Sequence, residues 1–175
     1  MMTNWGMETT IIGGCMVKIL VLIGVVCLWA TPSLAKEDKE LACMVEAIYF
    51  EARSESLHGK IAVGTVILNR VKSDYFPHLI CDVVHQAKYF ENRIVKNQCQ
   101  FSYYCDGKKE IYSDVKALLE SINVAQSILS GVEIANFECV THYHADYVMP
   151  YWAFYENIYF HSQIGRHLFY ETENC

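Results

Sequence analysis

The chain has 175 residues, a formal net charge of −6 and hydrophobic residues at 53% of its positions. An acidic chain without a cluster of basic residues argues against nucleic acid as a partner, because nucleic-acid binding depends on positive charge. Neutral or zwitterionic polymers remain open as ligands.

The first residues predict an export signal. Lys18 precedes an unbroken apolar run from Ile19 to Ala30, and Ser33 and Ala35 have the small-x-small spacing of a signal-peptidase site. The run is shorter than the roughly 20 residues that a bilayer crossing requires. We therefore expect a cut after Ala35, with an uncleaved signal anchor as the alternative.

The expected organisation is a signal peptide over residues 1–35 and one compact domain over residues 36–175. The stretch before Lys18 has no basic residue, and a translation start at Met16 would restore a short basic leader. Contact with a membrane is expected only through the signal segment.

Six cysteines follow the predicted cut: Cys43, Cys81, Cys99, Cys105, Cys139 and Cys175. An even number in an exported domain is typical of disulfides, although six thiols allow fifteen pairings. Cys99 and Cys105 are close enough in sequence to close a short loop, and we expect Cys43–Cys81 as a second pair. The chain has no CxxC motif, which argues against a zinc ribbon or a thioredoxin-like site.

Apolar periodicity predicts helices first and strands last. Residues 36–40 are predicted to be an irregular N-terminal segment. Helices are predicted over 41–52, 60–73 and 113–131, with a short one over 81–90. Residues 91–110 read as irregular, and the aromatic, β-prone last third reads as short strands and loops. The predicted fold class is α+β, in a single domain.

Three stretches in this order resemble one family: "AIYFEARSESLHGKIAVGTVILNRVKS", "QCQFSYYCDG" and "THYHADYVMPYW…QIGRHLFY". Together they are similar to the SleB-like cell-wall hydrolases, over about residues 41–170. The resemblance implies a lysozyme-like catalytic domain that cleaves the β-1,4 bond between N-acetylmuramic acid and N-acetylglucosamine, and related enzymes are lytic transglycosylases. The family usually has glycine where this chain has Ser54, which leaves the local turn to be examined.

The resemblance places the catalytic glutamate at Glu51, and the chemistry of the position agrees. Cleavage of a glycosidic bond requires an acid, and a carboxyl serves best when its pKa is raised toward about 6–7 by removal from water. Tyr49 and Phe50 are expected to supply part of the apolar wall.

Ordinary glycosidases need a second carboxylate, and Glu46, Glu55 and Asp106 are candidates for it, but none fits well. Glu55 is expected to pair with Arg53 or Lys60. A transglycosylase avoids the requirement, because the 6-hydroxyl of the sugar attacks C1 and one glutamate acts as acid and then as base.

Other residues are candidates for substrate binding because amide, hydroxyl and aromatic groups suit N-acetyl sugars: Gln100, Phe101, Ser102, Tyr143, His144 and Trp152. His142 and His144 stand two apart and would share one face of a strand, which also suits a zinc-dependent amidase. A third ligand is not convincingly placed, so we expect no metal and no cofactor. The "NRVK" segment, residues 69–72, reads as a helix end with solvated charge.

The expected partner is the glycan strand of peptidoglycan, in the periplasm or cell envelope, with targeting through the signal segment or a partner protein. The alternatives are a hydrolytic muramidase, a zinc-dependent N-acetylmuramoyl-alanine amidase, and an inactive domain that only binds murein.

Overall fold

The computed structural model describes residues 31–173, and side chains from residue 34 onward. The chain divides into two units, Met1–Asp38 and Lys39–Cys175, and the fold below is that of the second unit. Most of the predicted signal peptide lies outside the described residues, so its cleavage stays a prediction. Within the described part, no helix combines the length and the apolar character needed to cross a membrane.

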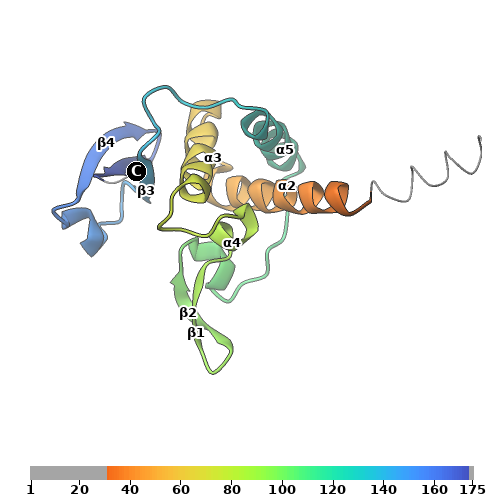
Figure 1. Cartoon of the computed structure of the whole chain (residues 1–175), viewed down its shortest axis with the longest axis horizontal. Helices are drawn as coiled ribbons and strands as arrows, with labels where there is room; N and C mark the ends of the chain where they lie inside the picture. Colours follow the sequence, from red (N-terminus) through yellow and green to blue (C-terminus); the bar gives the residue numbers. More distant parts are fainter. Residues whose placement is uncertain (1–30, 174–175) are drawn as a thin grey trace, which may run out of the picture. The chain divides into compact units, whose positions relative to one another are not determined.

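Helices and strands follow one another along the chain, with two short 3-10 turns (Figure 1). The helices are α2 (Thr31–Ala52), α3 (Leu57–Lys72), α4 (Ile80–Val84) and α5 (Val115–Leu129), and the 3-10 turns are η1 (Ser102–Cys105) and η2 (Tyr151–Phe154). The strands are β1 (Ala87–Phe90), β2 (Arg93–Cys99), β3 (Val140–Ala145), β4 (Ile158–Ile164) and β5 (His167–Thr172). The expected α+β, lysozyme-like class is confirmed.

Helix α3 is the centre of the fold. It lies between α2 and α5 on one side and the three-stranded antiparallel sheet β3-β5-β4 on the other (Figure 1). Ile67 belongs to the core shared with α2 and α5, whereas Val63 and Val66 pack with Phe169 of β5. Burial on nearly all sides explains why this β-branched sequence is a helix, since packing overrides intrinsic propensity.

Ser56 is the N-cap of α3 and accepts a hydrogen bond from the Gly59 backbone N–H at 3.3 Å. Asp114 caps α5 in the same way, through the Ala117 N–H at 3.0 Å. Such caps satisfy backbone donors that have no partner inside a helix. Both helices match the sequence prediction. Ser54 has no positive φ, so the turn between α2 and α3 does not require the glycine that the family usually has.

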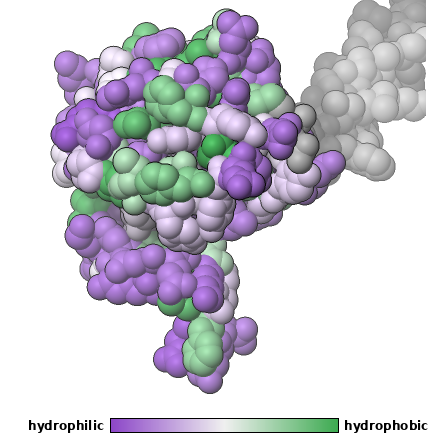
Figure 2. Space-filling view, turned by 90° about the vertical axis from the view of Figure 1, so that its left-hand side faces the viewer, coloured by the Kyte–Doolittle hydropathy of each residue, from purple (hydrophilic) through white to green (hydrophobic). Residues whose placement is uncertain are grey.

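Three parts of the secondary-structure prediction were wrong, and one of them is the stretch 91–110, which was predicted to be irregular but contains strand β2. Residues 36–40 are helical and belong to α2, because Lys and Glu are good helix formers. A short helix was predicted over residues 81–90, but the helix α4 ends at Val84. The chain continues as β1, which pairs with β2 in an antiparallel hairpin. This hairpin projects away from the helices in Figure 1, and it forms the narrow, mainly hydrophilic lobe at the bottom of Figure 2.

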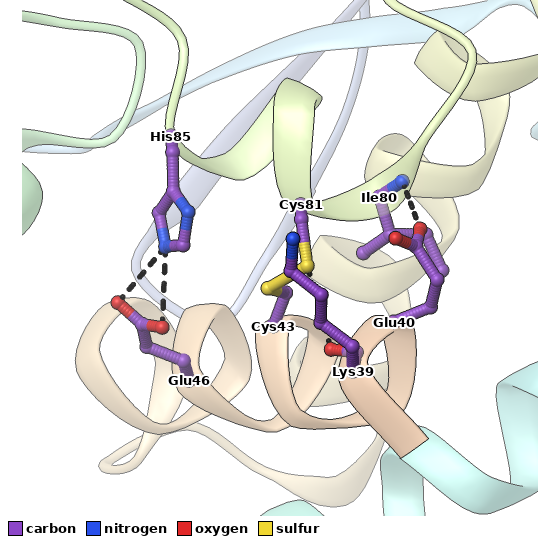
Figure 3. Close-up of a disulfide and its surroundings, with 7 residues drawn as sticks. All are labelled: Lys39, Glu40, Cys43, Glu46, Ile80, Cys81 and His85. Atoms are coloured by element: carbon purple, nitrogen blue, oxygen red, sulfur yellow. Dashed lines mark hydrogen bonds and ion pairs between the residues drawn. A yellow bond between two sulfur atoms is a disulfide. The ribbon is translucent and has the colours of Figure 1, made fainter. Parts of the chain in front are cut away.

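The predicted pairs Cys43–Cys81 and Cys99–Cys105 both form disulfides. The first joins α2 to α4, where two further contacts lie beside it (Figure 3). Glu40 accepts a hydrogen bond from the Ile80 N–H at 2.6 Å, and Glu46 lies 3.2 Å from Nε2 of His85. Together these contacts hold α4 against the helix that carries Glu51.

Replacement of Gly64 by alanine is expected to destabilise the domain. Helices α3 and α5 approach so closely that a Cβ at Gly64 would clash with Cδ1 of Ile128. Overpacking of a buried site costs about 1–3 kcal/mol. Urea unfolding should show this loss for Gly64→Ala, and Gly64→Ala/Ile128→Val should recover part of it because the clashing methyl is removed. A single variant as stable as the wild type would contradict this close packing.

Candidate active site

The last turn of α2 places Glu51 at the junction of the helices and the sheet. Its carboxyl is half-buried, and Oε2 accepts a hydrogen bond of 3.2 Å from the hydroxyl of Tyr143 on β3. The Tyr143 ring is fixed from behind by His167 and Phe169 of β5, at centroid distances of 5.1 and 5.7 Å. The sheet therefore holds one donor against the carboxyl, although the two residues are far apart in sequence.

Burial raises the pKa of Glu51 from 4.5 to about 7. The hydrogen bond from Tyr143 and the positive charge of Arg70 act in the opposite direction, because both favour the carboxylate, but they do not offset the loss of solvation. Near neutral pH a substantial fraction of the carboxyl keeps its proton. Such a group can donate a proton and, once ionised, take one back.

Arg70 was predicted to lie on a solvated helix end, and this prediction was wrong. It is only 4% exposed, and its Nε donates a hydrogen bond of 2.7 Å to the Thr141 carbonyl. The guanidinium lies over the rings of Phe76 and Phe101, at 5.2 and 5.5 Å. Burial lowers the pKa of Arg70 to about 10, so it remains a cation at neutral pH beside Glu51.

Asn69 braces the same junction. Its Nδ2 donates to the carbonyls of Phe137 and Val140, at 2.7 and 2.9 Å. The end of α3 thus fixes both the segment that enters β3 and the start of β3. This arrangement sets the position of Tyr143 relative to Glu51.

Tyr103, in the loop closed by the Cys99–Cys105 disulfide, brings a second phenol close to the charge of Glu51. Its ring stacks on Phe50 at 4.9 Å, and its buried hydroxyl has no hydrogen-bond partner among the described residues. Burial, and then the negative charges of Glu46 and Glu51, raises the pKa of Tyr103. The phenol therefore stays protonated and is available as a donor.

The other carboxylates that were weighed have other partners. Glu46 pairs with His85, and Asp106 accepts a 2.7 Å hydrogen bond from the Lys108 N–H, as expected of a turn residue. The predicted pairing of Glu55 was wrong. Glu55 accepts from the Arg166 N–H at 3.2 Å, in the β4–β5 turn, and Lys60 instead pairs with Glu120 at 2.6 Å. Gly165 is required beside this contact, because its φ is +58° and a Cβ there would clash with the Glu55 carboxylate.

Of the predicted substrate-binding residues, Gln100 and Trp152 both line a surface groove whose wall also includes Phe76 and His142. Ser102 is exposed at the start of η1. Phe101 and His144 are different, because both side chains are buried. Phe101 is 1% exposed under Arg70, and His144 stacks on Tyr170 with its Nε2 2.9 Å from the tyrosine hydroxyl. Neither ring offers a free face to a ligand, so we assign both to packing.

His142 and His144 do share a strand face, since Trp152 contacts both rings at 5.2 and 5.7 Å. Burial, together with the charge of Arg70, lowers the pKa of His142 to about 4. Within residues 34–173, the one group of three potential metal ligands is Cys43, Glu46 and His85, away from this pair. The Cys43 sulfur belongs to a disulfide, so that group offers no thiolate.

A half-buried carboxyl of raised pKa, which accepts a hydrogen bond from a phenol and feels the charge of a buried cation, is a candidate acid–base site on an α+β scaffold. A profile of the cell wall hydrolase family matches residues 54–170. The chain belongs to the cell wall hydrolase family. Glu51 lies three residues before the matched segment, so its role does not follow from that match.

The chain is similar to spore cortex-lytic enzymes over a short segment. It is 39% identical to the enzyme of Oceanobacillus iheyensis over 53 residues, which is 30% of this chain and 19% of the relative. The enzyme of Bacillus subtilis is 34% identical over 53 residues, 30% of this chain and 17% of the relative. The similarity thus spans less than a fifth of the length of either relative.

Two solved structures share the fold. The catalytic domain of the germination-specific lytic transglycosylase SleB from Bacillus anthracis aligns with a TM-score of 0.55 and 24% identity, over 74% of this chain and 92% of that chain. The SleB catalytic domain of Bacillus cereus aligns with a TM-score of 0.52 and 23% identity, over 75% of this chain and 89% of that one.

Proposed function

We propose that this chain degrades peptidoglycan by cleaving the β-1,4 bond between N-acetylmuramic acid and N-acetylglucosamine as a lytic transglycosylase. The observation that carries the proposal is the Glu51 carboxyl, whose pKa burial raises to about 7 in a member of the cell wall hydrolase family. The lytic transglycosylase activity named for the Bacillus anthracis structure supports the choice of reaction.

In the first step, protonated Glu51 gives its proton to the glycosidic oxygen, and the bond between that oxygen and C1 of muramic acid breaks. Glu51 is then a carboxylate, which the cation of Arg70 and the hydrogen bond from Tyr143 stabilise. In the second step, the 6-hydroxyl oxygen of the same sugar bonds to C1 and its proton passes to Glu51. A 1,6-anhydro ring is formed, and the acid is regenerated.

A single carboxyl is sufficient for this sequence of steps. Burial raises the pKa of Glu51, whereas the pKa values of Asp106 and Glu120 are lowered by their lysine partners. A mechanism with two carboxylates needs one on each side of the sugar. The pairing of Glu46 with His85 and of Glu55 with the β4–β5 turn supports the one-carboxylate route.

Product analysis tests the proposal. Purified sacculi are digested with the wild type and with Glu51→Gln, and the soluble muropeptides are examined by mass spectrometry. We expect 1,6-anhydro-muramic acid ends from the wild type. Reducing muramic acid ends alone would indicate a hydrolytic muramidase, free stem peptides an amidase, and binding without soluble products an inactive murein-binding module; each of these results would refute the proposal.

We also propose that the catalytic domain comprises residues 36–175 and acts outside the cytoplasm, after export directed by residues 1–35. Two disulfides support this location, because disulfides persist in oxidising compartments. Targeting within the envelope is assigned to the signal segment or to a partner protein.

The rate should fall at alkaline pH as Glu51 loses its proton, and replacement of Tyr143 by phenylalanine is expected to move this alkaline limb of the pH–rate profile to higher pH. The hydrogen bond from Tyr143 favours the carboxylate, so its loss raises the pKa of Glu51. Tyr170→Phe is a matched control. It also removes a tyrosine hydroxyl from this sheet, but that hydroxyl is hydrogen-bonded to His144 and not to Glu51. An alkaline limb that moves to lower pH in Tyr143→Phe, or that moves equally in both variants, would contradict the assigned contact.

A further inference from the structure

A polar cavity of about 720 Å³ lies between the base of the β1–β2 hairpin and η2. We call it the amide pocket and define it by four amide side chains and two aromatic ones: Gln86, Asn97, Gln98, Gln100, Tyr151 and Trp152. Its volume lies in the range of about 300–1,000 Å³ that is usual for ligand sites. The proposed chemistry at Glu51 does not account for this cavity.

The backbone of the pocket is well fixed. The Gln100 N–H donates to the Gln86 carbonyl at 2.9 Å, which closes the base of the hairpin, and the Cys99–Cys105 disulfide anchors the neighbouring residue. Asn97 has a positive φ of 59°, a conformation that asparagine tolerates better than most residues. The amides are therefore held on a rigid ribbon.

The lining is polar but nearly uncharged. Each amide offers two donors and one acceptor oxygen, and Lys88 is the one ionic side chain in the wall. Amide side chains thus stand beside rings, which is the combination that a neutral ligand with hydroxyl and acetamido groups requires.

An exposed ring adds an apolar surface. Tyr151 is 76% exposed at the start of η2, and its neighbour Trp152 is half-buried. Aromatic side chains contribute large contact area and a polar tip, so they suit ligands that have both apolar faces and hydroxyl groups. Pyranose rings are ligands of this kind.

The amide pocket adjoins a second groove, with which it shares two lining residues. Gln100 and Trp152 also line a cavity of about 370 Å³ whose wall includes Phe76 and His142. The Arg70 guanidinium lies 5.2 Å from the Phe76 ring and acts electrostatically on Glu51. The two cavities therefore meet at Gln100 and Trp152.

We infer that the amide pocket binds an N-acetylated sugar of the glycan strand, at a distance from the bond that is cleaved. The inference rests on the proposed function for the identity of the polymer. The acetamido group is assigned to Asn97, Gln98 and Gln100, and one face of the sugar ring to Tyr151. The substrate is then a strand of several sugars rather than a single disaccharide.

The test is a binding measurement on a protein that does not turn over. The β-1,4-linked tetramer of N-acetylglucosamine is titrated by calorimetry into Glu51→Gln, and into the same protein with Tyr151→Ala or Asn97→Gly added. Glycine preserves the positive φ at position 97 while it removes the amide. We expect each added change to weaken binding about tenfold, the size of one lost stacking or hydrogen-bonding contact.

Tyr147→Ala is the matched control. Tyr147 is 75% exposed, almost the same as Tyr151, but lies outside the amide pocket. Its replacement should leave the affinity unchanged, and circular dichroism should show that all variants are folded. No binding of the tetramer to Glu51→Gln, or equal affinity in the Tyr147 and Tyr151 variants, would overturn the inference.

A second comparison separates sugar from peptide recognition. The KM of Tyr151→Ala is measured on intact sacculi and on glycan strands stripped of their stem peptides, in a background with Glu51 intact. We expect a rise of about tenfold on both substrates. A rise on intact sacculi alone would assign the pocket to the stem peptide and refute the sugar assignment. If Glu51 proved not to be catalytic, the calorimetric difference would persist, so the two proposals can fail separately.

Discussion

Glu51→Gln is expected to reduce the release of soluble muropeptides from sacculi by about 10³-fold. Glutamine has nearly the same shape as protonated glutamate but cannot give its proton to the leaving oxygen, and general acid catalysis contributes about 10²–10⁴-fold to such reactions. Glu46→Gln is a suitable control, because Glu46 lies on the same helix and pairs with His85 instead. Comparable losses in the two variants would contradict a specific role for Glu51.

Glu51→Gln is also expected to stabilise the fold above pH 7. The pKa of Glu51 is raised from 4.5 in the unfolded chain to about 7 in the folded one, so the folded state binds more protons between these values. Stability therefore falls as pH rises from 4.5 to 7, and the full cost is present above pH 7. Removal of the carboxyl should increase the free energy of unfolding at pH 8 by about 3 kcal/mol, with little change at pH 4.

The second large effect is expected in the pH dependence of the reaction. Because Glu51 must be protonated to begin the reaction and its pKa is about 7, kcat/KM should fall above pH 7, about tenfold per pH unit. Arg70, Tyr143 and Tyr103 are the titratable groups that interact with this carboxyl.

Arg70→Gln should move the alkaline limb to higher pH, because the loss of a nearby positive charge disfavours the carboxylate and raises the pKa of Glu51. Arg70→Lys keeps the charge and should restore the limb toward its wild-type position. Arg70 is buried, so folding is checked by circular dichroism. A downward shift in Arg70→Gln, or identical profiles in the glutamine and lysine variants, would contradict the electrostatic role of Arg70.

Much of the helical part could be predicted because its apolar residues recur at helical spacing. Helix α5 has both a capping residue, Asp114, and a clear apolar stripe, so the predicted and observed bounds nearly coincide. Strand β2 could not be found in this way. It is exposed on both faces, and an exposed ribbon such as RIVKNQC has no alternation for a period-two pattern to detect.

The chemistry at Glu51 could be predicted from a motif, but its electrostatic surroundings could not. Arg70 ends a helix with basic residues, which usually indicates solvated charge. Its burial depends on Phe76 and Phe101, which come from separate loops and cover the guanidinium only after the chain has folded. Tyr103 belongs to a loop that was expected to bind sugar, and its approach to Glu51 likewise depends on tertiary packing.

Direct titration of the Glu51 carboxyl tests most directly whether this group keeps its proton near neutral pH. Protein with ¹³C-labelled glutamate carboxyls is followed by NMR from pH 4 to pH 9, and the Glu51 resonance is identified by its absence from Glu51→Gln. We expect a midpoint near pH 7, coincident with the alkaline limb of kcat/KM. A carboxyl that is already ionised at pH 5 would contradict this expectation.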